Sequence, residues 1–145
     1  MDEDLFQLGI KALITNSEGK ILLLKVNSEK LKNYKGEPYW DIPGGRIHRH
    51  ASILDTLIRE IKEETDISEI ISMHHLTTVI SNIRIPLDGT DTGLILSVYV
   101  CKINDPINIT LSDEHTEYRW SSSKEAVELL SIKYPKEFTD KIKEL

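Results

Sequence analysis

The stretch GRIHRHASILDTLIREIKEETDI, residues 45–67, contains the clearest helix signal in the chain. Ser52 followed by Asp55 is a capping-box pattern, which predicts the start of a helix over residues 52–65. Apolar residues at helical spacing predict one buried stripe along this helix, made of Ile53, Leu54, Leu57, Ile58 and Ile61. Asp66 follows where glycine is more usual, and aspartate tolerates the left-handed conformation there at some cost.

Three glutamates of this helix, Glu60, Glu63 and Glu64, share one sector beside the apolar stripe. Like charges at i and i+4 destabilise a helix by about 0.2–0.5 kcal/mol per pair, and acids are unfavourable near the negative end of the helix dipole. Lys62 falls on the far side of the helix and does not neutralise them. A hard divalent cation would relieve the repulsion, whereas the alternative is a solvated acidic face.

The rest of the chain alternates between apolar runs and polar turns. Residues 5–15 and 21–26 flank a compact turn signal and predict a β-hairpin. Further strands are expected at 71–85, 93–103 and 117–121, helices at 123–130 and from Pro135 onward, and loops at 27–38, 86–92 and 104–116. Strands before and after a central helix indicate one α+β or mixed α/β domain over residues 1–145.

Residues 45–67 resemble the Nudix box, whose pattern is Gly, five residues, Glu, seven residues, then Arg-Glu-apolar-any-Glu-Glu-any-Gly-apolar. The spacing from Gly45 to Arg59 matches, and the core Arg-Glu-Ile-Lys-Glu-Glu is intact. Two positions depart from the pattern, since Ala51 stands where the family has glutamate and Asp66 where it has glycine.

The resemblance extends beyond the box. Residues 40–44 look like the segment that leads into it, and residues 111–120 look like the late segment of several Nudix subfamilies, including diadenosine tetraphosphate hydrolases. The resemblance implies an α/β/α sandwich around a mixed sheet. It also implies metal-dependent hydrolysis, by water attack at phosphorus, of a nucleoside diphosphate linked to another moiety.

The resemblance implies that Glu60, Glu63 and Glu64 bind Mg²⁺ or Mn²⁺. The general base stays open among Glu63, Glu64 and Glu114, with Glu64 favoured as a ligand and Glu114 as an acid outside the box. Arg59 is expected to face away from the glutamates. It would order the loop before the helix, with Asp55 replacing the missing box glutamate as its partner, or it would contact phosphate.

Candidate substrate contacts are Gly44, Gly45, Arg46 and Tyr39. The two glycines allow backbone N–H groups to approach a phosphate closely. Tyr34, Tyr39 and Trp40 either stack on a nucleobase or belong to the core. The five histidines are expected to be surface or strand residues rather than metal ligands: His48, His50, His74, His75 and His115.

Composition narrows the functional class. A net charge of −6 argues against binding duplex nucleic acid, and the lone Cys101 forms no internal disulfide. An acidic N-terminus and the lack of an apolar run near 20 residues long predict a cytoplasmic protein without a membrane segment. The alternative to an enzyme is a catalytically silent Nudix module that senses a nucleotide. The substrate and the formation of a homodimer stay open.

Overall fold

The computed structural model describes residues 2–31, 36–104 and 108–145, which form a mixed sheet of eight strands with three helices. The strands are β1 (Phe6–Thr15), β2 (Ile21–Val26), β3 (Trp40–Asp41), β4 (Gly44–Arg46), β5 (Ser72–Ile80), β6 (Ile85–Leu87), β7 (Thr90–Lys102) and β8 (His115–Ser121). The helices are α1 (Ile53–Thr65), α2 (Ser123–Leu130) and α3 (Lys136–Lys143), with a 3₁₀ turn, η1, at Ser28–Lys30. Among the described residues, no helix has the length and apolar content to cross a membrane.

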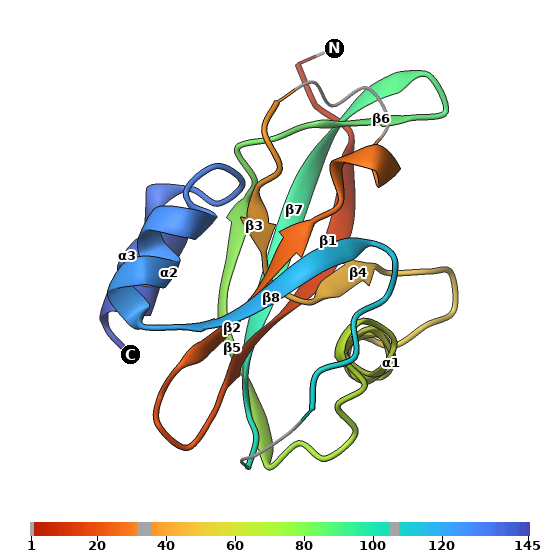
Figure 1. Ribbon diagram of the computed structural model, residues 1–145. Coiled ribbons are helices and arrows are strands. Elements are labelled where there is room, and N and C mark those ends of the chain that lie inside the picture. Colours follow the sequence, from red (N-terminus) through yellow and green to blue (C-terminus); the bar gives the residue numbers. More distant parts are fainter. Residues whose placement is uncertain (1, 32–35, 105–107) are drawn as a thin grey trace.

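Helices cover both faces of the sheet, with α2 and α3 on one side and α1 on the other (Figure 1). Along β1, Ile10, Ala12 and Ile14 pack in the cluster that contains Leu57 of α1. Leu13 points the opposite way, into the cluster formed with α2 and α3. Because successive strand residues face opposite sides, a sheet covered on both faces requires the unbroken apolar runs of β1 and β2. This arrangement confirms the predicted mixed α/β sandwich.

The predicted hairpin is correct only at its turn. β1 and β2 pair antiparallel at Thr15 and Ile21. Beyond that point β1 pairs in parallel with β7 along its whole length, while β2 pairs with β8 and β3. Long-range partners therefore separate two strands that are adjacent in the sequence, and the local pattern contains no signal for those partners.

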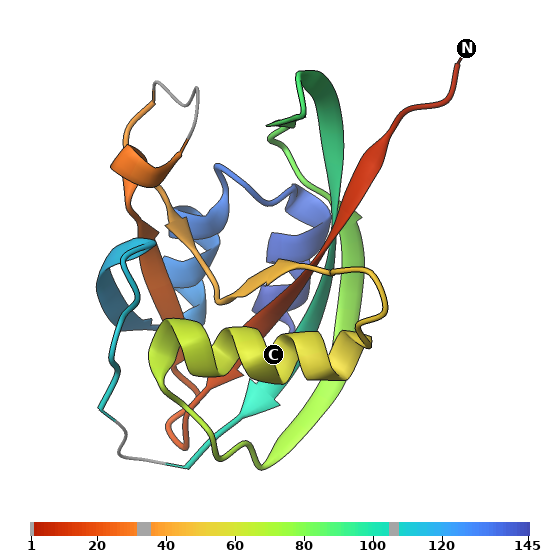
Figure 2. The same cartoon turned by 90° about the vertical axis from the view of Figure 1, so that its right-hand side faces the viewer.

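The predicted ends of α1 are confirmed. The Ser52 hydroxyl accepts a hydrogen bond from the Asp55 N–H at 3.1 Å. At the other end Asp66 has a φ of 66°, and its N–H donates to the carbonyl of Lys62 at 2.9 Å. Helix α1 runs across the sheet in Figure 2.

The predicted apolar stripe of α1 is partly wrong. Leu57 and Ile61 are fully buried, but Ile53, Leu54 and Ile58 are 37%, 47% and 44% exposed. The buried face of the helix instead continues through Glu64, which is 2% exposed. The helix is thus rotated so that a carboxylate, rather than the rest of the apolar stripe, lies against the sheet.

Several strand boundaries also differ from the prediction. The expected strand 71–85 ends at Ile80, because Ser81 Oγ donates to the Lys133 carbonyl at 2.7 Å and Asn82 Nδ2 to the Tyr134 carbonyl at 2.9 Å. These bonds tie the chain to the α2–α3 connection. The expected loop 86–92 is mostly strand around a two-residue turn, and β8 begins two residues earlier than predicted. Tyr34 lies outside the described residues.

Candidate active site

Glu64 is buried in the last turn of α1, beneath the turn that leads into β4. The Gly44 N–H donates to Glu64 Oε2 at 2.9 Å. Gly44 has a φ of 153°, and a Cβ atom added there would overlap the Ile10 carbonyl oxygen, so only glycine fits. The Pro-Gly-Gly segment therefore lets a backbone donor approach the helix carboxylate.

The environment of Glu64 favours either a proton or a cation on its carboxylate. Burial raises the pKa of Glu64 to about 8, against its usual value of 4.5. The Lys11 ammonium and the Gly44 N–H oppose this shift, while the carboxylates of Glu60 and Glu114 add to it. A bound divalent cation would offset both the desolvation and the repulsion between carboxylates.

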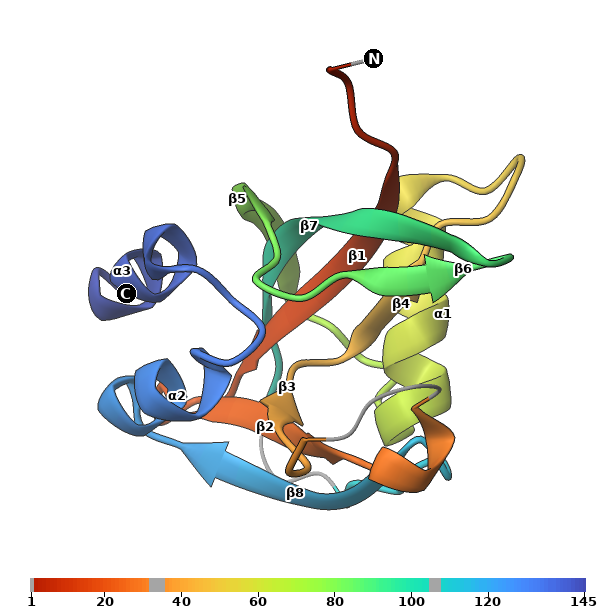
Figure 3. The same ribbon diagram turned by 90° about the horizontal axis from the view of Figure 1, so that it is seen from above.

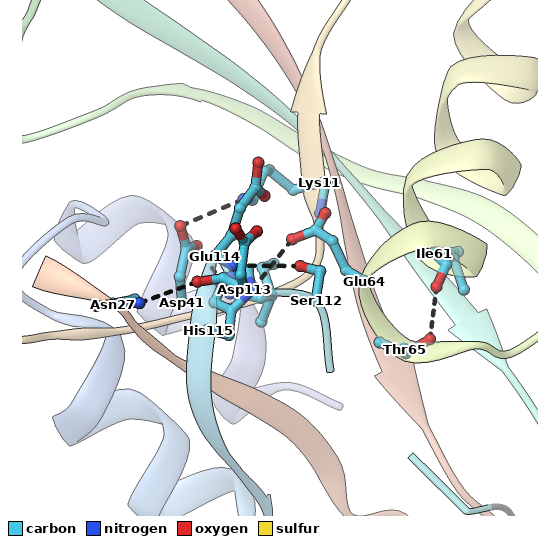
Figure 4. A network of polar contacts seen from close by, with 12 residues as sticks. Lys11, Asn27, Asp41, Ile61, Glu64, Thr65, Ser112, Asp113, Glu114 and His115 are labelled. Atoms are coloured by element: carbon cyan, nitrogen blue, oxygen red, sulfur yellow. Dashed lines mark hydrogen bonds and ion pairs between the residues drawn. The ribbon is translucent and has the colours of Figure 1, made fainter. Parts of the chain in front are cut away.

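Glu114, in the turn just before β8, and His115, the first residue of β8, complete a cluster around Glu64. One ligand atom from each of the three side chains lies within 4.8 Å of the other two (Figure 4). His115 Nδ1 lies 3.5 Å from Glu64 Oε1, is buried, and has no hydrogen-bond partner among the described residues. Burial, together with Lys11, lowers the pKa of His115 to about 4, so its imidazole is neutral and can offer a lone pair. Two carboxylates and an unpartnered imidazole nitrogen fit a divalent cation.

A cavity of about 680 Å³ opens beside this cluster. Its wall includes Glu64, Glu114 and His115, and also the four substrate contacts predicted from the sequence: Tyr39, Gly44, Gly45 and Arg46. Residues of β6 and of the η1 turn also line the cavity, and Figure 3 shows these elements on either side of β4. Of the three predicted metal ligands, only Glu64 lines this cavity, where it faces the same space as the four predicted substrate contacts.

A NUDIX domain is recognised over residues 5–142, most of the chain. The chain belongs to the Nudix family. It is 28% identical over 121 residues to the mouse (Mus musculus) asymmetrical bis(5'-nucleosyl)-tetraphosphatase, covering 81% of this chain and 74% of the mouse protein. It is also 38% identical over 61 residues to Nudix hydrolase 5 of Arabidopsis thaliana, covering 42% of this chain but only 19% of that protein. The crystal structure of a MutT protein from Methanosarcina mazei Go1 superposes with a TM-score of 0.75 at 25% identity, covering 99% and 95% of the two chains.

The other two glutamates of the Nudix box, Glu60 and Glu63, are not members of this cluster. The Glu60 carboxylate packs closely against the backbone of β4: a Cβ atom added at Gly45 would lie only 2.6 Å from Glu60 Cδ. The Glu63 side chain is 55% exposed. The structure therefore gathers Glu64 with Glu114 and His115, and leaves Glu60 and Glu63 flanking that cluster.

The prediction for Arg59 of the Nudix box is wrong in its direction. Arg59 Nη1 lies 3.2 Å from Glu60 Oε1 and 3.6 Å from Glu63 Oε1, so the guanidinium pairs with the glutamates rather than facing away from them. An arginine can reach an acid four residues on either side of it, and Glu63 satisfies that spacing as well as Asp55 does. Arg59 Nη2 is buried without a hydrogen-bond partner among the described residues, while Ala51, at the position of the box glutamate, offers no side-chain acceptor.

The Nudix cavity also has a charged floor built around Asp41. Asp41 Oδ2 lies 2.6 Å from Lys133 Nζ and 3.3 Å from Lys11 Nζ, and Asp41 Oδ1 accepts a hydrogen bond from the Tyr134 hydroxyl at 2.6 Å. Burial alone would raise the pKa of Asp41, but the two ammonium groups hold it well below its usual range. The Asp41 carboxylate is therefore ionised and joins β1, β3 and the α2–α3 connection.

Sequence reasoning missed four residues of this Nudix site: Lys11, Asp41, His115 and Lys133. Lys11 had a usable signal, because it is the single charge within the apolar run LGIKALI of β1. His115 also had a usable signal, because it adjoins the predicted acid Glu114. Lys133 lies far from every motif, and only the packing of the α2–α3 connection brings it to Asp41.

Proposed function

We propose that this Nudix protein is a divalent-metal-dependent hydrolase that cleaves a diphosphate linkage in a nucleotide derivative by water attack at phosphorus. The observation that carries this proposal is the cluster of Glu64, Glu114 and His115 at the wall of a cavity of about 680 Å³. The name of the mouse relative supports a dinucleoside polyphosphate as the first substrate to test.

Glu64, Glu114 and His115 would hold Mg²⁺ or Mn²⁺, with the flanking Glu60 and Glu63 as further carboxylate ligands. Such a cation neutralises phosphate charge and lowers the pKa of a water molecule bound to it. A cation is needed for a second reason, because a protein of net charge −6 repels a polyphosphate.

The chain's own groups would orient the substrate and accept a proton. The Gly44 and Gly45 backbone, Arg46 and Tyr39 line the cavity where a phosphate and the nucleoside would lie. Glu114 is exposed and offers one oxygen to the metal cluster, so its other carboxylate oxygen can reach a water molecule and serve as the general base. Glu63 offers a second exposed carboxylate for this role.

The test is hydrolysis of a substrate panel that contains diadenosine tetraphosphate, a nucleoside triphosphate and ADP-ribose, with Mg²⁺ or Mn²⁺ and with products identified. We expect turnover of at least one compound, loss of turnover in excess chelator, and recovery when the metal is restored. Tight binding of a nucleotide without any turnover would support the silent sensing module instead. Full activity in excess chelator would rule out the metal-dependent reaction.

A further inference from the structure

We propose that Lys11 and Lys133 form an anion subsite that binds a phosphate group of the substrate at the floor of the cavity. This inference rests on the proposed function. It deepens that function by naming two residues that select substrates with a phosphate chain longer than a diphosphate.

The first argument is a count of hydrogen-bond donors and acceptors. Asp41 Oδ1 accepts bonds from the Tyr134 hydroxyl and from the Ile42 N–H, and Asp41 Oδ2 faces both lysines. A carboxylate accepts about four hydrogen bonds, so Asp41 is saturated. Each ammonium group has three donors, and within the described residues the hydrogen bonds of Lys11 Nζ and Lys133 Nζ go to Asp41 alone. Donors on both lysines therefore remain available to a ligand.

The second argument concerns charge in a buried place. The side chains of Lys11, Lys133 and Asp41 are 7%, 11% and 6% exposed, and all three residues line the cavity. Two ammonium groups face one carboxylate, and a buried charge that is not fully paired is costly. The other acids of the cavity wall near this floor, Glu64 and Glu114, belong to the candidate metal cluster. Once a cation occupies that cluster, the excess positive charge of the floor calls for an anion from the substrate.

The third argument is that the subsite is preorganised. Lys11 projects from the central strand β1, and the Lys133 backbone is held by the hydrogen bonds from Ser81 and Asn82 to its carbonyl oxygen. Tyr134 anchors Asp41 between the two lysines. Little reordering is needed before a phosphate binds, which favours affinity.

The position of the subsite bears on the choice of substrate. The acidic cluster would hold the diphosphate that is cleaved, whereas Lys11 and Lys133 hydrogen-bond to Asp41, which lines the same cavity but is not a member of that cluster. A substrate with three or more phosphates can occupy both places. A substrate with two phosphates, such as ADP-ribose, engages the lysines less.

The first experiment measures the binding of inorganic tripolyphosphate by calorimetry in saturating Mg²⁺, so that a cation can occupy the acidic cluster. We expect wild-type protein to bind it and Lys133→Gln to weaken binding about tenfold or more, the loss typical of a hydrogen bond to a charged group. Lys133→Arg should largely keep the affinity. The matched control is Lys136→Gln, three residues along and 83% exposed, which should leave affinity unchanged. Failure of the wild type to bind, or equal binding by Lys133→Gln, would overturn the subsite.

The second experiment compares steady-state kinetics on diadenosine tetraphosphate and ADP-ribose. We expect Lys133→Gln to raise KM for the tetraphosphate about tenfold with little change in kcat, because uniform binding is lost. The rise for ADP-ribose should be clearly smaller, and an equal rise for both would refute the selection by chain length. A wild type that binds tripolyphosphate but hydrolyses nothing would refute the proposed function and leave the subsite standing. If a thermal melt shows that Lys133→Gln does not fold, the binding of tripolyphosphate by wild type and by Lys133→Arg still tests the subsite.

Discussion

Glu63 and Glu64 are neighbours in the sequence but lie in different environments. The Glu64 carboxylate is 3% exposed and receives a hydrogen bond from Gly44, whereas the Glu63 carboxylate is 55% exposed and lies 3.6 Å from Arg59. We expect Glu64→Gln to lower kcat by about 10²-fold or more, as for loss of a positioned catalytic group, and Glu63→Gln to lower it by a smaller factor. Steady-state kinetics of the two variants measures which substitution lowers kcat more. Near-wild-type turnover of Glu64→Gln would mean that the acidic face is only a structural or solvated feature.

The raised pKa of Glu64 also predicts how the stability of the metal-free protein depends on pH. Its pKa is about 8 in the folded protein and near 4.5 when exposed, so the folded state binds more protons between these values. The stabilisation from Glu64 is complete below pH 4.5 and is lost as the pH rises through 8, at no more than about 1.4 kcal/mol per pH unit. His115, whose pKa is lowered to about 4, acts in the opposite sense below pH 6.5, so the effect is read above that pH.

Thermal melts in chelator at pH 6.5 and pH 8 provide the measurement. Wild-type protein should lose more stability between these pH values than Glu64→Gln does. The comparison with the variant is needed because burial lowers the pKa of Lys11, which acts in the opposite sense at alkaline pH. Parallel changes in the two proteins would contradict the raised pKa of Glu64.

At the scale of elements, the end of β2 holds the start of β8 in place. The Asn27 N–H donates to the Glu114 carbonyl at 2.9 Å, and Asn27 Nδ2 donates to the Asp113 carbonyl at 3.0 Å. Asn27 Oδ1 also accepts a hydrogen bond from the Glu29 N–H, and this bond caps the start of the η1 turn. Asn27→Ala should therefore destabilise the protein by about 0.5–2 kcal/mol and lower kcat by displacing Glu114.

The matched control is Asn16→Ala. The Asn16 side chain also accepts backbone hydrogen bonds in a turn after a strand, from Glu18 and Lys20, but it lies in the β1–β2 turn. Asn16→Ala should lower the free energy of unfolding by a similar amount. It should leave kcat unchanged at a temperature where both variants are folded. Equal effects of the two variants on kcat would show that Asn27 acts through stability alone.

At the scale of the whole molecule, the cation should stabilise the fold because its ligands come from elements far apart in the sequence. Glu64 lies in the last turn of α1, while Glu114 directly precedes β8 and His115 begins it, so unfolding separates them. At a Mn²⁺ concentration of 100 times Kd, linkage predicts about 2.7 kcal/mol of added stability, or a rise of roughly 5–10 °C in Tm.

A thermal melt with Mn²⁺ and with chelator measures this rise. His115→Gln should reduce it, and the exposed His74→Gln on β5 is the control that should keep it. A full rise in the His115 variant would remove His115 from the ligand set while leaving the carboxylates in place.

Features carried by short-range patterns could be predicted from the amino-acid sequence alone. The helix from Ser52 to Asp66, with its cap and its left-handed end, follows from local hydrogen bonding and spacing. The resemblance to the Nudix box, and with it the mixed α/β sandwich, follows from the fixed spacing between Gly45 and Glu64. Spacing along a helix is a local geometric property, so it is readable without knowledge of the fold.

Features that depend on contacts between distant segments required the fold. The sequence does not reveal that β1 pairs along its length with β7 rather than with β2. It also does not reveal that Glu64 of α1 is buried while Ile58 is exposed, or that Lys133 forms an ion pair with Asp41. Each of these results from packing of both faces of the sheet, where burial and charge pairing are optimised together. No residue carries a local signal of a partner that lies 92 positions away in the sequence.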